Sequence, residues 1–362
     1  MKQLMFEGRY VAELTATVIR QEELKILHNR INWERVYRMA VYHHVTPILY
    51  LGILGNKEAL PEKWSERFFA RYQKAVQYSK VYEREEEMIL TLCENKGIFC
   101  TVFRDGSLRA EYPLPEMAGR PALILMASDR LSYSRVKGYL IDLGYETYKR
   151  CPGFGECMAK EDGIRVEIYY KLPFLVIRYQ EVIEDLLSVI AKENNTEAYV
   201  QRLSEEDMFL FKMAETAYHY AEGTLTLREM LDLMFLHRKI RENMSSEQLW
   251  EELKEFGIDE LAGPLLDLAY FWFGTREEAA MAERKEETEL FDMLERRILA
   301  RDESGEEIID QAKELKEEIR YETERILKGE ERRTAKEQKI TESPGIWHWW
   351  LRGVKKLLKR KK

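Results

Sequence analysis

Residues 103–129 contain the side chains of this sequence whose types and spacing come closest to a phosphate-transfer site. A short apolar run leads into Asp105-Gly106-Ser107, and a glycine turn of this kind lets backbone N–H groups approach a phosphate. Magnesium-dependent transfer also needs carboxylates, and two acids separated by one residue on a strand point to the same face. The next apolar run, residues 122–127, contains no acid. The stretch therefore has the turn of such a site and lacks its paired carboxylates.

A series of short motifs continues on both sides of this turn. In chain order they are Gly97-Ile98, Asp105-Gly106-Ser107, Tyr112-Pro113, Arg120, the run 122–127, Leu143-Gly144-Tyr145 and Val166-Glu167-Ile168-Tyr169. Their order resembles an uncharacterised bacterial nucleotidyltransferase family of the polymerase-beta-like superfamily, over about residues 30 to 275. The resemblance extends into a helical half, where His219, Gly223, Arg228 and Asp232 stand at matching places. It implies a nucleotidyltransferase fold and, in an active member, transfer of a nucleoside monophosphate from a triphosphate to a hydroxyl acceptor.

The sequence departs from this family pattern at the metal-binding positions. Counted back from Gly144-Tyr145, the expected acid-x-acid pair falls on Leu123 and Leu125. Leucine offers magnesium no oxygen ligand, so the metal cannot be held in the family manner. We therefore expect no metal and no cofactor, and magnesium would be needed only by the alternative of an active enzyme.

Three further positions differ from the family pattern. Asp105 replaces a phosphate-attracting lysine, Tyr169 replaces the histidine of the acid-x-histidine strand, and Glu215 stands where a histidine would precede His219. Glu167 is the one catalytic candidate that the resemblance retains. The substrate-binding candidates that it implies are Gly106, Ser107, Arg120, His219, Arg228 and Asp232.

Other acids near the apolar run could replace the missing pair. Asp129 follows the run at the start of a predicted helix, where an N-cap role is favoured. Glu111 and Glu116 lie on the connecting loop without a fixed partner, and Asp105 facing Glu167 would give a one-metal site. Each of these signals is weaker than the loss of the acid pair, so an inactive site is the favoured interpretation.

Each retained residue also has a structural interpretation. Gly106 would be needed where a tight turn requires its backbone freedom. Glu167 would form an ion pair with Arg120 or Arg165. The three candidates of the helical half either line a cleft between the two halves or tie helices together. The sequence leaves both interpretations open.

Helices and a small sheet must position these residues. Apolar spacings of three and four predict helices up to about residue 95, the third of them at 62–95. Short apolar runs then predict a mixed sheet of about four or five strands, with a hairpin turning at Glu161-Asp162-Gly163, and helical patterns return from about Gln180. The expected fold class is α+β. The expected domains are N-terminal helices at 1–95, a nucleotidyltransferase-like core at 96–178, C-terminal helices at 179–275, a charged helical extension at 276–340 and a basic amphipathic tail at 341–362.

The composition excludes several classes of protein. The 362 residues are 45% hydrophobic and can bury one large core or two ordinary ones. A net charge of −8 disfavours a general nucleic-acid binder, because phosphate neutralisation needs a basic face. The four cysteines lack paired CxxC spacing, so we expect reduced thiols. The sequence has no secretory signal and no apolar run of about 20 residues, which predicts a cytoplasmic protein.

The tail carries a second candidate for binding. Residues 352–362 hold seven Lys or Arg and no acid. On a helix, one stripe would contain Trp347, Trp350, Leu351, Val354, Leu357 and Leu358. This composition is typical of a helix on an anionic membrane surface, so we expect residues 346–362 to contact such a surface or a protein partner. Docking on the protein's own acidic body is the equal alternative, and nucleic acid is disfavoured because the aromatic residues lie on the apolar side.

Three functions stay open from the sequence. The favoured one is a nucleotidyltransferase-fold protein that has lost catalysis and binds a nucleotide, a small molecule or a protein in the former cleft. The alternatives are an active magnesium-dependent nucleotidyltransferase and a membrane-peripheral scaffold that works through its basic tail. Under the favoured function the chain is not an enzyme.

Overall fold

The computed structural model describes residues 2–22, 31–54, 60–171, 198–241, 245–255, 258–283 and 289–300. The basic tail expected at 341–362 lies outside these residues, as does the charged extension beyond residue 300. The expected domain boundaries stay a prediction.

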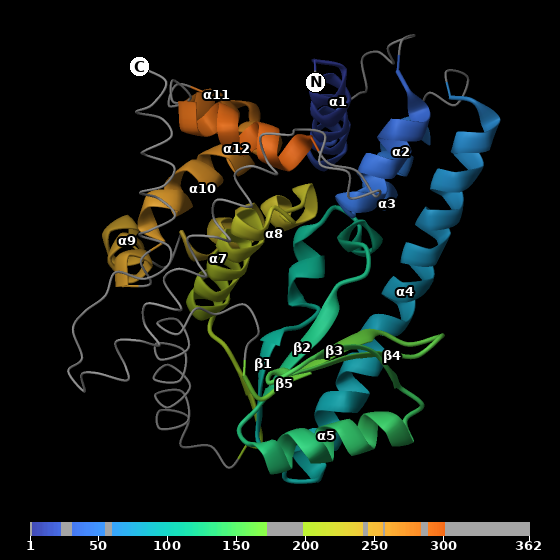
Figure 1. The fold of residues 1–362 in the computed structure, drawn as a ribbon, viewed down its shortest axis with the longest axis vertical. Coiled ribbons are helices and arrows are strands. Elements are labelled where there is room, and N and C mark those ends of the chain that lie inside the picture. The colour runs from blue at the N-terminus through green and yellow to red at the C-terminus, as the bar shows by residue number, and fades with distance from the viewer. Residues whose placement is uncertain are drawn as a thin grey trace, which may run out of the picture.

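Helices form the N-terminal part of the structure (Figure 1). Their bounds are α1 Lys2–Ile19, α2 Trp33–Tyr42, α3 Thr46–Leu54 and α4 Glu62–Asn95. The long helix α4 has the bounds that the apolar spacing predicts, but it is the fourth helix instead of the expected third, because the segment before it is divided into α2 and α3. Its buried side chains include Tyr78, Tyr82 and Ile89, which pack against the sheet. Between α2 and α3 the chain turns at His44, which has a left-handed φ of 58°.

The described residues form one six-stranded mixed sheet, and the expected α+β class is confirmed. The strands are β1 Cys100–Arg104, β2 Ala122–Ala127, β3 Glu146–Cys151, β4 Gly155–Ala159, β5 Arg165–Tyr169 and β6 Val200–Arg202. Their order is β3-β4-β5-β2-β1-β6, with β2/β5 and β1/β6 parallel and the other pairs antiparallel. The sheet exceeds the expected four or five strands because β6, from the region with helical patterns, pairs with the edge of β1.

Short helices connect β1 to β2, and a longer helix follows β2. The connection contains two 3-10 helices, η2 Ser107–Glu111 and η3 Pro115–Ala118. Helix α5 runs from Arg130 to Asp142, and Asp129 caps it by accepting hydrogen bonds from the N–H groups of Leu131 and Ser132 at 2.7 and 2.8 Å. The N-cap role expected for Asp129 is therefore confirmed.

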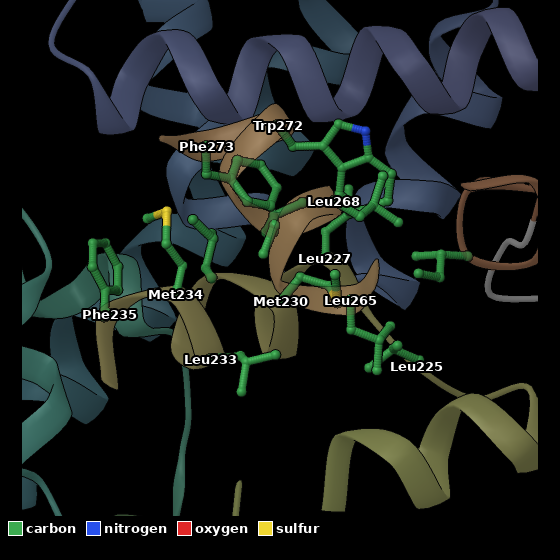
Figure 2. Close-up of a cluster of buried hydrophobic side chains, with 14 of the residues drawn as sticks. Leu225, Leu227, Met230, Leu233, Met234, Phe235, Leu265, Leu268, Trp272 and Phe273 are labelled. Atoms are coloured by element: carbon green, nitrogen blue, oxygen red, sulfur yellow. The ribbon is translucent and has the colours of Figure 1, made fainter. Parts of the chain in front are cut away.

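A second group of helices follows β6. Their bounds are α7 Glu205–Glu222, α8 Leu227–Ile240, α9 Ser246–Glu255, α10 Asp259–Phe273, α11 Arg276–Glu283 and α12 Glu289–Leu299. Thr226 and Glu229 form a reciprocal capping box at the start of α8, which satisfies two backbone donors. Figure 2 shows the apolar side chains of α8 and α10, among them Met230, Leu265 and Phe273, gathered in one cluster.

The sheet separates two hydrophobic clusters. Leu123 and Leu125 belong to the cluster formed with α4 and α5, while Ile124 and Met126 belong to the cluster on the side of the other helices. This division follows from the strand period of two, because neighbouring residues of β2 point to opposite faces. β2 is buried along its whole length, which explains its continuous apolar sequence.

The first and last described helices pack against each other. A Cβ atom at Gly8 of α1 would lie 2.5 Å from the Leu299 carbonyl oxygen of α12, and Arg9 forms an ion pair with Glu295 at 2.5 Å. Residues on both sides of the central part of the chain thus contribute to one packed structure. Among the described helices, none combines the length and apolar character needed to cross a membrane. All four cysteines are free thiols.

Candidate functional site

The glycine turn after β1 is closed by carboxylates of the protein itself. The Gly106 N–H donates to the Glu86 carboxylate of α4 at 3.1 Å, and the Ser107 N–H donates to the Asp105 carboxylate at 2.8 Å. These are the backbone donors that a phosphate would need at such a turn. The turn brings Gly106 and Ser107 together as expected, but both N–H groups already have anionic acceptors.

Gly106 is required by close packing. Its φ of −77° is open to any residue, so the expected need for backbone freedom does not hold. A Cβ atom at this position would instead lie 2.8 Å from both the Tyr82 ring and a carboxylate oxygen of Glu86. The glycine therefore allows α4 to approach the turn.

The closed turn is an acidic cluster neutralised by an arginine. Burial, followed by the neighbouring charge of Asp105, raises the pKa of the Glu86 carboxyl. Arg202 of β6 forms an ion pair with Asp105 and lies 3.9 Å from Glu86. The charge of Asp105 is therefore balanced within the protein.

Glu167 lies beside Ile124 in the sheet. The parallel register of β2 and β5 pairs Ile124 with Glu167, and the register of β4 pairs Cys157 with Glu167. Paired residues of neighbouring strands project from the same face. Leu123 and Leu125 pair with Val166 and Ile168 and thus lie on the opposite face.

This register changes which residues would complete a carboxylate site with Glu167. An acid-x-acid pair sharing its face would require Ile124 together with Ala122 or Met126. All three are apolar and buried. The structure therefore does not bring the two expected positions, Leu123 and Leu125, to the side of Glu167. It places other apolar residues there.

A bulge in β1 adds a cation to the Glu167 face. The β1/β2 register shifts between Val102 and Arg104, so that Arg104 lies opposite Ile124. The Arg104 guanidinium forms an ion pair with Glu215 of α7. Burial opposes the charge of Arg104, but the carboxylates of Glu215, Glu167 and Asp232 outweigh it and raise the pKa of the guanidinium.

The Glu215 ion pair continues into the helical half. Lys212, itself buried, lies 2.9 Å from Glu215 and 3.9 Å from Glu229. Glu229 in turn contacts the His219 imidazole. Burial would lower the pKa of His219, but the charge and hydrogen bond of Glu229 prevail and raise it. His219 therefore belongs to an ion-pair network that joins α7, α8 and β1.

Arg228 and Asp232 also tie elements together. The Arg228 guanidinium donates to Asp232 at 3.0 Å and to the Met117 carbonyl at 3.0 Å, and it stacks over the Tyr112 ring at 4.4 Å. The Tyr112 hydroxyl donates to Asp232 at 2.6 Å. These contacts join α8 to the connection between β1 and β2. Arg228 and Asp232 therefore tie elements together, and their role in binding a substrate stays a prediction.

Glu167 forms neither of the two expected ion pairs, with Arg120 or with Arg165, among the described residues. Glu167 accepts a hydrogen bond from the Tyr169 hydroxyl at 2.9 Å. Arg165 donates to the Arg120 carbonyl, and the Arg120 guanidinium lies 5.0 Å from the centre of the Tyr78 ring. Tyr169 thus fills the place of the family's histidine with a phenol bound to the retained acid.

The two acids of the connecting loop have partners that the sequence did not reveal. Glu111 lies 3.3 Å from Lys239 of α8, and Glu116 accepts a hydrogen bond from Tyr72 of α4 at 2.8 Å. Within the described residues, no group of three or more His, Cys, Asp or Glu side chains is arranged to hold a metal ion.

Sequence reasoning missed Glu86, Arg104 and Arg202. Glu86 belongs to a run of charged residues on α4 that is typical of a solvated helix face, and the bulge that redirects Arg104 has no sequence signal. The consecutive apolar and basic residues at the end of β1 could have indicated a cation beside the turn. Its partner on α7, 111 residues away, could not be predicted.

The chain matches one known protein family. The family is described as "Uncharacterised nucleotidyltransferase", and the match covers residues 29–274, more than half of the 362 residues. No curated protein and no solved structure gives a significant match.

Proposed function

The chain belongs to the uncharacterised nucleotidyltransferase family, and from this premise we propose that it keeps the family fold without metal-dependent nucleotidyl transfer. The observation that carries the proposal is the hydrogen bond from the Gly106 N–H to the Glu86 carboxylate at 3.1 Å. A phosphate at this turn would have to displace Glu86 from the Gly106 N–H and Asp105 from the Ser107 N–H, and the nearby Arg202 is already paired with Asp105. The turn therefore disfavours a triphosphate.

The residues present do not fit the divalent cation that nucleotidyl transfer requires. Magnesium binds hard oxygen ligands in an octahedral arrangement. On the face of Glu167, the neighbouring strand offers Ile124 and Met126, which carry no oxygen in their side chains.

Arg104 supports the same proposal. Its guanidinium provides a permanent positive charge beside Glu215 on the sheet face where Glu167 lies. A guanidinium donates hydrogen bonds but has no open coordination position for a substrate hydroxyl. Arg104 therefore balances the negative charge of Glu215 and Glu167 but does not supply the chemistry of a metal ion.

We infer that the protein acts by binding a ligand on this sheet face. Across the sheet, Glu167 of β5 pairs with Cys157 of β4, and Cys157 pairs with Lys149 of β3, so the three positions form one row. β3 is an exposed edge strand of the sheet. Tyr148 of the same strand is 54% exposed. A ligand can therefore reach the β3 end of this row from solvent. A nucleotide, another small molecule and a protein segment remain the proposed ligand classes.

Calorimetry with the full chain tests the loss of transfer. ATP, CTP, GTP and UTP are titrated with and without magnesium, and the heat of binding is compared between the two conditions. We expect no magnesium-dependent tight binding for any of the four. Tight binding that requires magnesium would overturn the proposal, and product formation with a hydroxyl acceptor would establish the active alternative.

A further inference from the structure

A stripe of exposed cations follows one side of α4. Its members are Lys63, Arg67, Arg71 and Lys74, and spacings of four, four and three residues place them on the same side of the helix. Among the residues that the structure describes, no carboxylate forms an ion pair with any of the four. This basic stripe is therefore a local excess of positive charge on a chain whose net charge is −8.

Two aromatic rings connect the cations of the basic stripe. Tyr37 of α2 and Trp64 of α4 are half-buried, and their ring centres lie 5.6 Å apart where α2 and the first turns of α4 lie side by side (Figure 1). The Arg67 guanidinium lies 5.1 Å from the centre of the Trp64 ring and 5.6 Å from that of Tyr37. The Lys63 ammonium lies 5.1 Å from the Trp64 ring, and the Arg71 Nε donates to the Tyr37 hydroxyl at 3.4 Å. These distances join three cations and two rings into one surface.

The chemistry of this surface fits carboxylates. A guanidinium that rests on an aromatic ring still presents a planar fork of N–H donors, which matches the two oxygens of a carboxylate. The ring contacts also restrict the Arg67 side chain before binding, which lowers the entropy lost when a ligand fixes it. Tryptophan, tyrosine and arginine are the residue types that most often dominate the binding energy of protein interfaces.

The spacing of the cations fits an extended peptide. Lys63, Arg67 and Arg71 follow one another at four-residue steps, which correspond to about 6 Å along the helix axis. In an extended chain, every second side chain points to the same side, at a repeat of about 6.6 Å. An acid at every second position of such a chain would therefore meet successive cations of the basic stripe.

The ring contacts favour a carboxylate ligand over a nucleic acid. Single-stranded nucleic acids bind through bases that stack on open aromatic faces. Here the Trp64 ring already contacts Lys63 and Arg67, and the Tyr37 ring already contacts Arg67. A stacked base would have to displace these cations from the rings, whereas a carboxylate can bind them where they lie.

We propose that the basic stripe, together with Tyr37 and Trp64, binds an extended acidic segment of a partner protein. The net negative charge of the chain repels such a segment from other surfaces, so electrostatics directs it to this one. The surface lies on α2 and the first turns of α4, outside the sheet and the glycine turn. It is thus independent of the proposed loss of nucleotidyl transfer.

Fluorescence anisotropy of a labelled peptide tests the proposal with the full chain at low ionic strength. About five extended residues span the basic stripe, and the probe is a fluorescein-labelled peptide of twice that length in which Glu alternates with Ser. We expect saturable binding of this probe and no binding of a peptide that carries Gln in place of every Glu. Arg67→Gln combined with Arg71→Gln should weaken the affinity about tenfold or more, because charge-assisted hydrogen bonds are removed.

Lys80→Gln combined with Arg84→Gln is the matched control. Both residues are exposed on α4, beyond the basic stripe and on another side of the helix, and the control removes the same number of charges. Its affinity should equal that of the unmodified chain. Equal urea midpoints of the two double variants check that both are folded, as expected for glutamine at exposed helix positions.

Three results would overturn the proposal. Unchanged affinity in the Arg67 and Arg71 double variant would place the peptide elsewhere, such as on the basic residues 352–362. Equal weakening in both double variants would show that the peptide responds to net charge alone. A single-stranded oligothymidylate that binds more tightly than the peptide, with the same dependence on Arg67 and Arg71, would identify a nucleic acid as the ligand of this surface.

Discussion

Glu167 and Ile124 are directly paired across β5 and β2, so the acid kept from the family pattern faces an aliphatic side chain on the neighbouring strand. Leu123 and Leu125, on the other face, are only 0% and 1% exposed in the cluster formed with α4 and α5. The two faces therefore differ in what a new carboxylate would meet. A carboxylate at position 124 would lie beside Arg104, whereas one at position 125 would lie among apolar side chains.

This difference predicts unequal costs for two aspartate substitutions. Leu125→Asp should lower the free energy of unfolding by about 4 kcal/mol or more, because it buries an unpaired charge. Ile124→Asp should cost about 2 kcal/mol less, because Arg104, opposite the new carboxylate, offsets the repulsion from the paired Glu167. Urea unfolding measures both, and the asparagine variants at the same positions separate charge from shape. We expect magnesium to stabilise neither variant. Equal costs at the two positions would contradict the register.

Opening the glycine turn should restore affinity for phosphate groups. Glu86→Ala combined with Asp105→Lys frees the Gly106 N–H and replaces a repelling charge with an attracting one. Calorimetry should then detect ATP binding at least about tenfold tighter than in the unmodified chain, with or without magnesium. Glu86→Gln alone keeps a side-chain acceptor for the Gly106 N–H and serves as the control, with affinity close to that of the unmodified chain. An unchanged ATP affinity in the double variant would argue against turn closure as the reason for weak binding.

Breaking the Arg104–Glu215 ion pair should strongly destabilise the folded protein. Glu215 is buried, so Arg104→Met would leave its charge with Lys212 as the remaining partner and lower the free energy of unfolding by at most about 3–5 kcal/mol. Adding Glu215→Gln should recover part of this loss, because the buried charge that has lost a partner disappears. A double-mutant cycle in urea measures the coupling. Strictly additive losses would show that the two groups do not interact.

The His219–Glu229 pair predicts a pH dependence of stability with a defined sign. The pKa of His219 is raised in the folded protein, so its stabilising contribution is complete below its unfolded pKa and is lost as pH rises through the folded value. The pKa of Glu229 is lowered to about 2, so its contribution is present above the ordinary carboxyl range and is lost as pH falls towards about 2.

Two substitutions check this assignment. Tm measured against pH follows the effect. In the His219→Gln variant, Tm should no longer fall as the pH rises through the histidine range. Glu229→Gln should flatten the same part of the profile while keeping the capping box, which glutamine can also form. If the His219 variant retains the full alkaline loss, another group is responsible.

The basic tail gives a prediction that depends on the sequence alone, since residues 341–362 lie outside the described residues. The full chain should float with vesicles that contain anionic lipid, whereas a chain ending at residue 343 should not. Each basic residue near anionic headgroups contributes about 1 kcal/mol, so neutral vesicles should bind neither form. Equal flotation of the two chains on anionic vesicles would remove the membrane alternative.

The sequence by itself determined the features that depend on local chemistry. The bounds of α4, the N-cap at Asp129 and the hairpin between β4 and β5 followed from apolar spacing, capping residues and a glycine turn. The absence of acids from β2 was also visible in the residue order, and this absence argues against a metal site in either register. These features are local because neighbouring residues along the chain fix them.

Only the tertiary structure decided what each candidate residue contacts. The strand period of two makes the face of every β2 side chain depend on register, and the bulge at Arg104 breaks the alternation that the sequence would predict. The acceptor of the Gly106 N–H comes from a helix 20 residues earlier, and the partner of Arg104 comes from one 111 residues later. Such pairings arise when packed elements bring distant residues together. Because of this packing and the local Asp105 contact, the backbone N–H groups of the apparent phosphate-binding turn already donate to carboxylates.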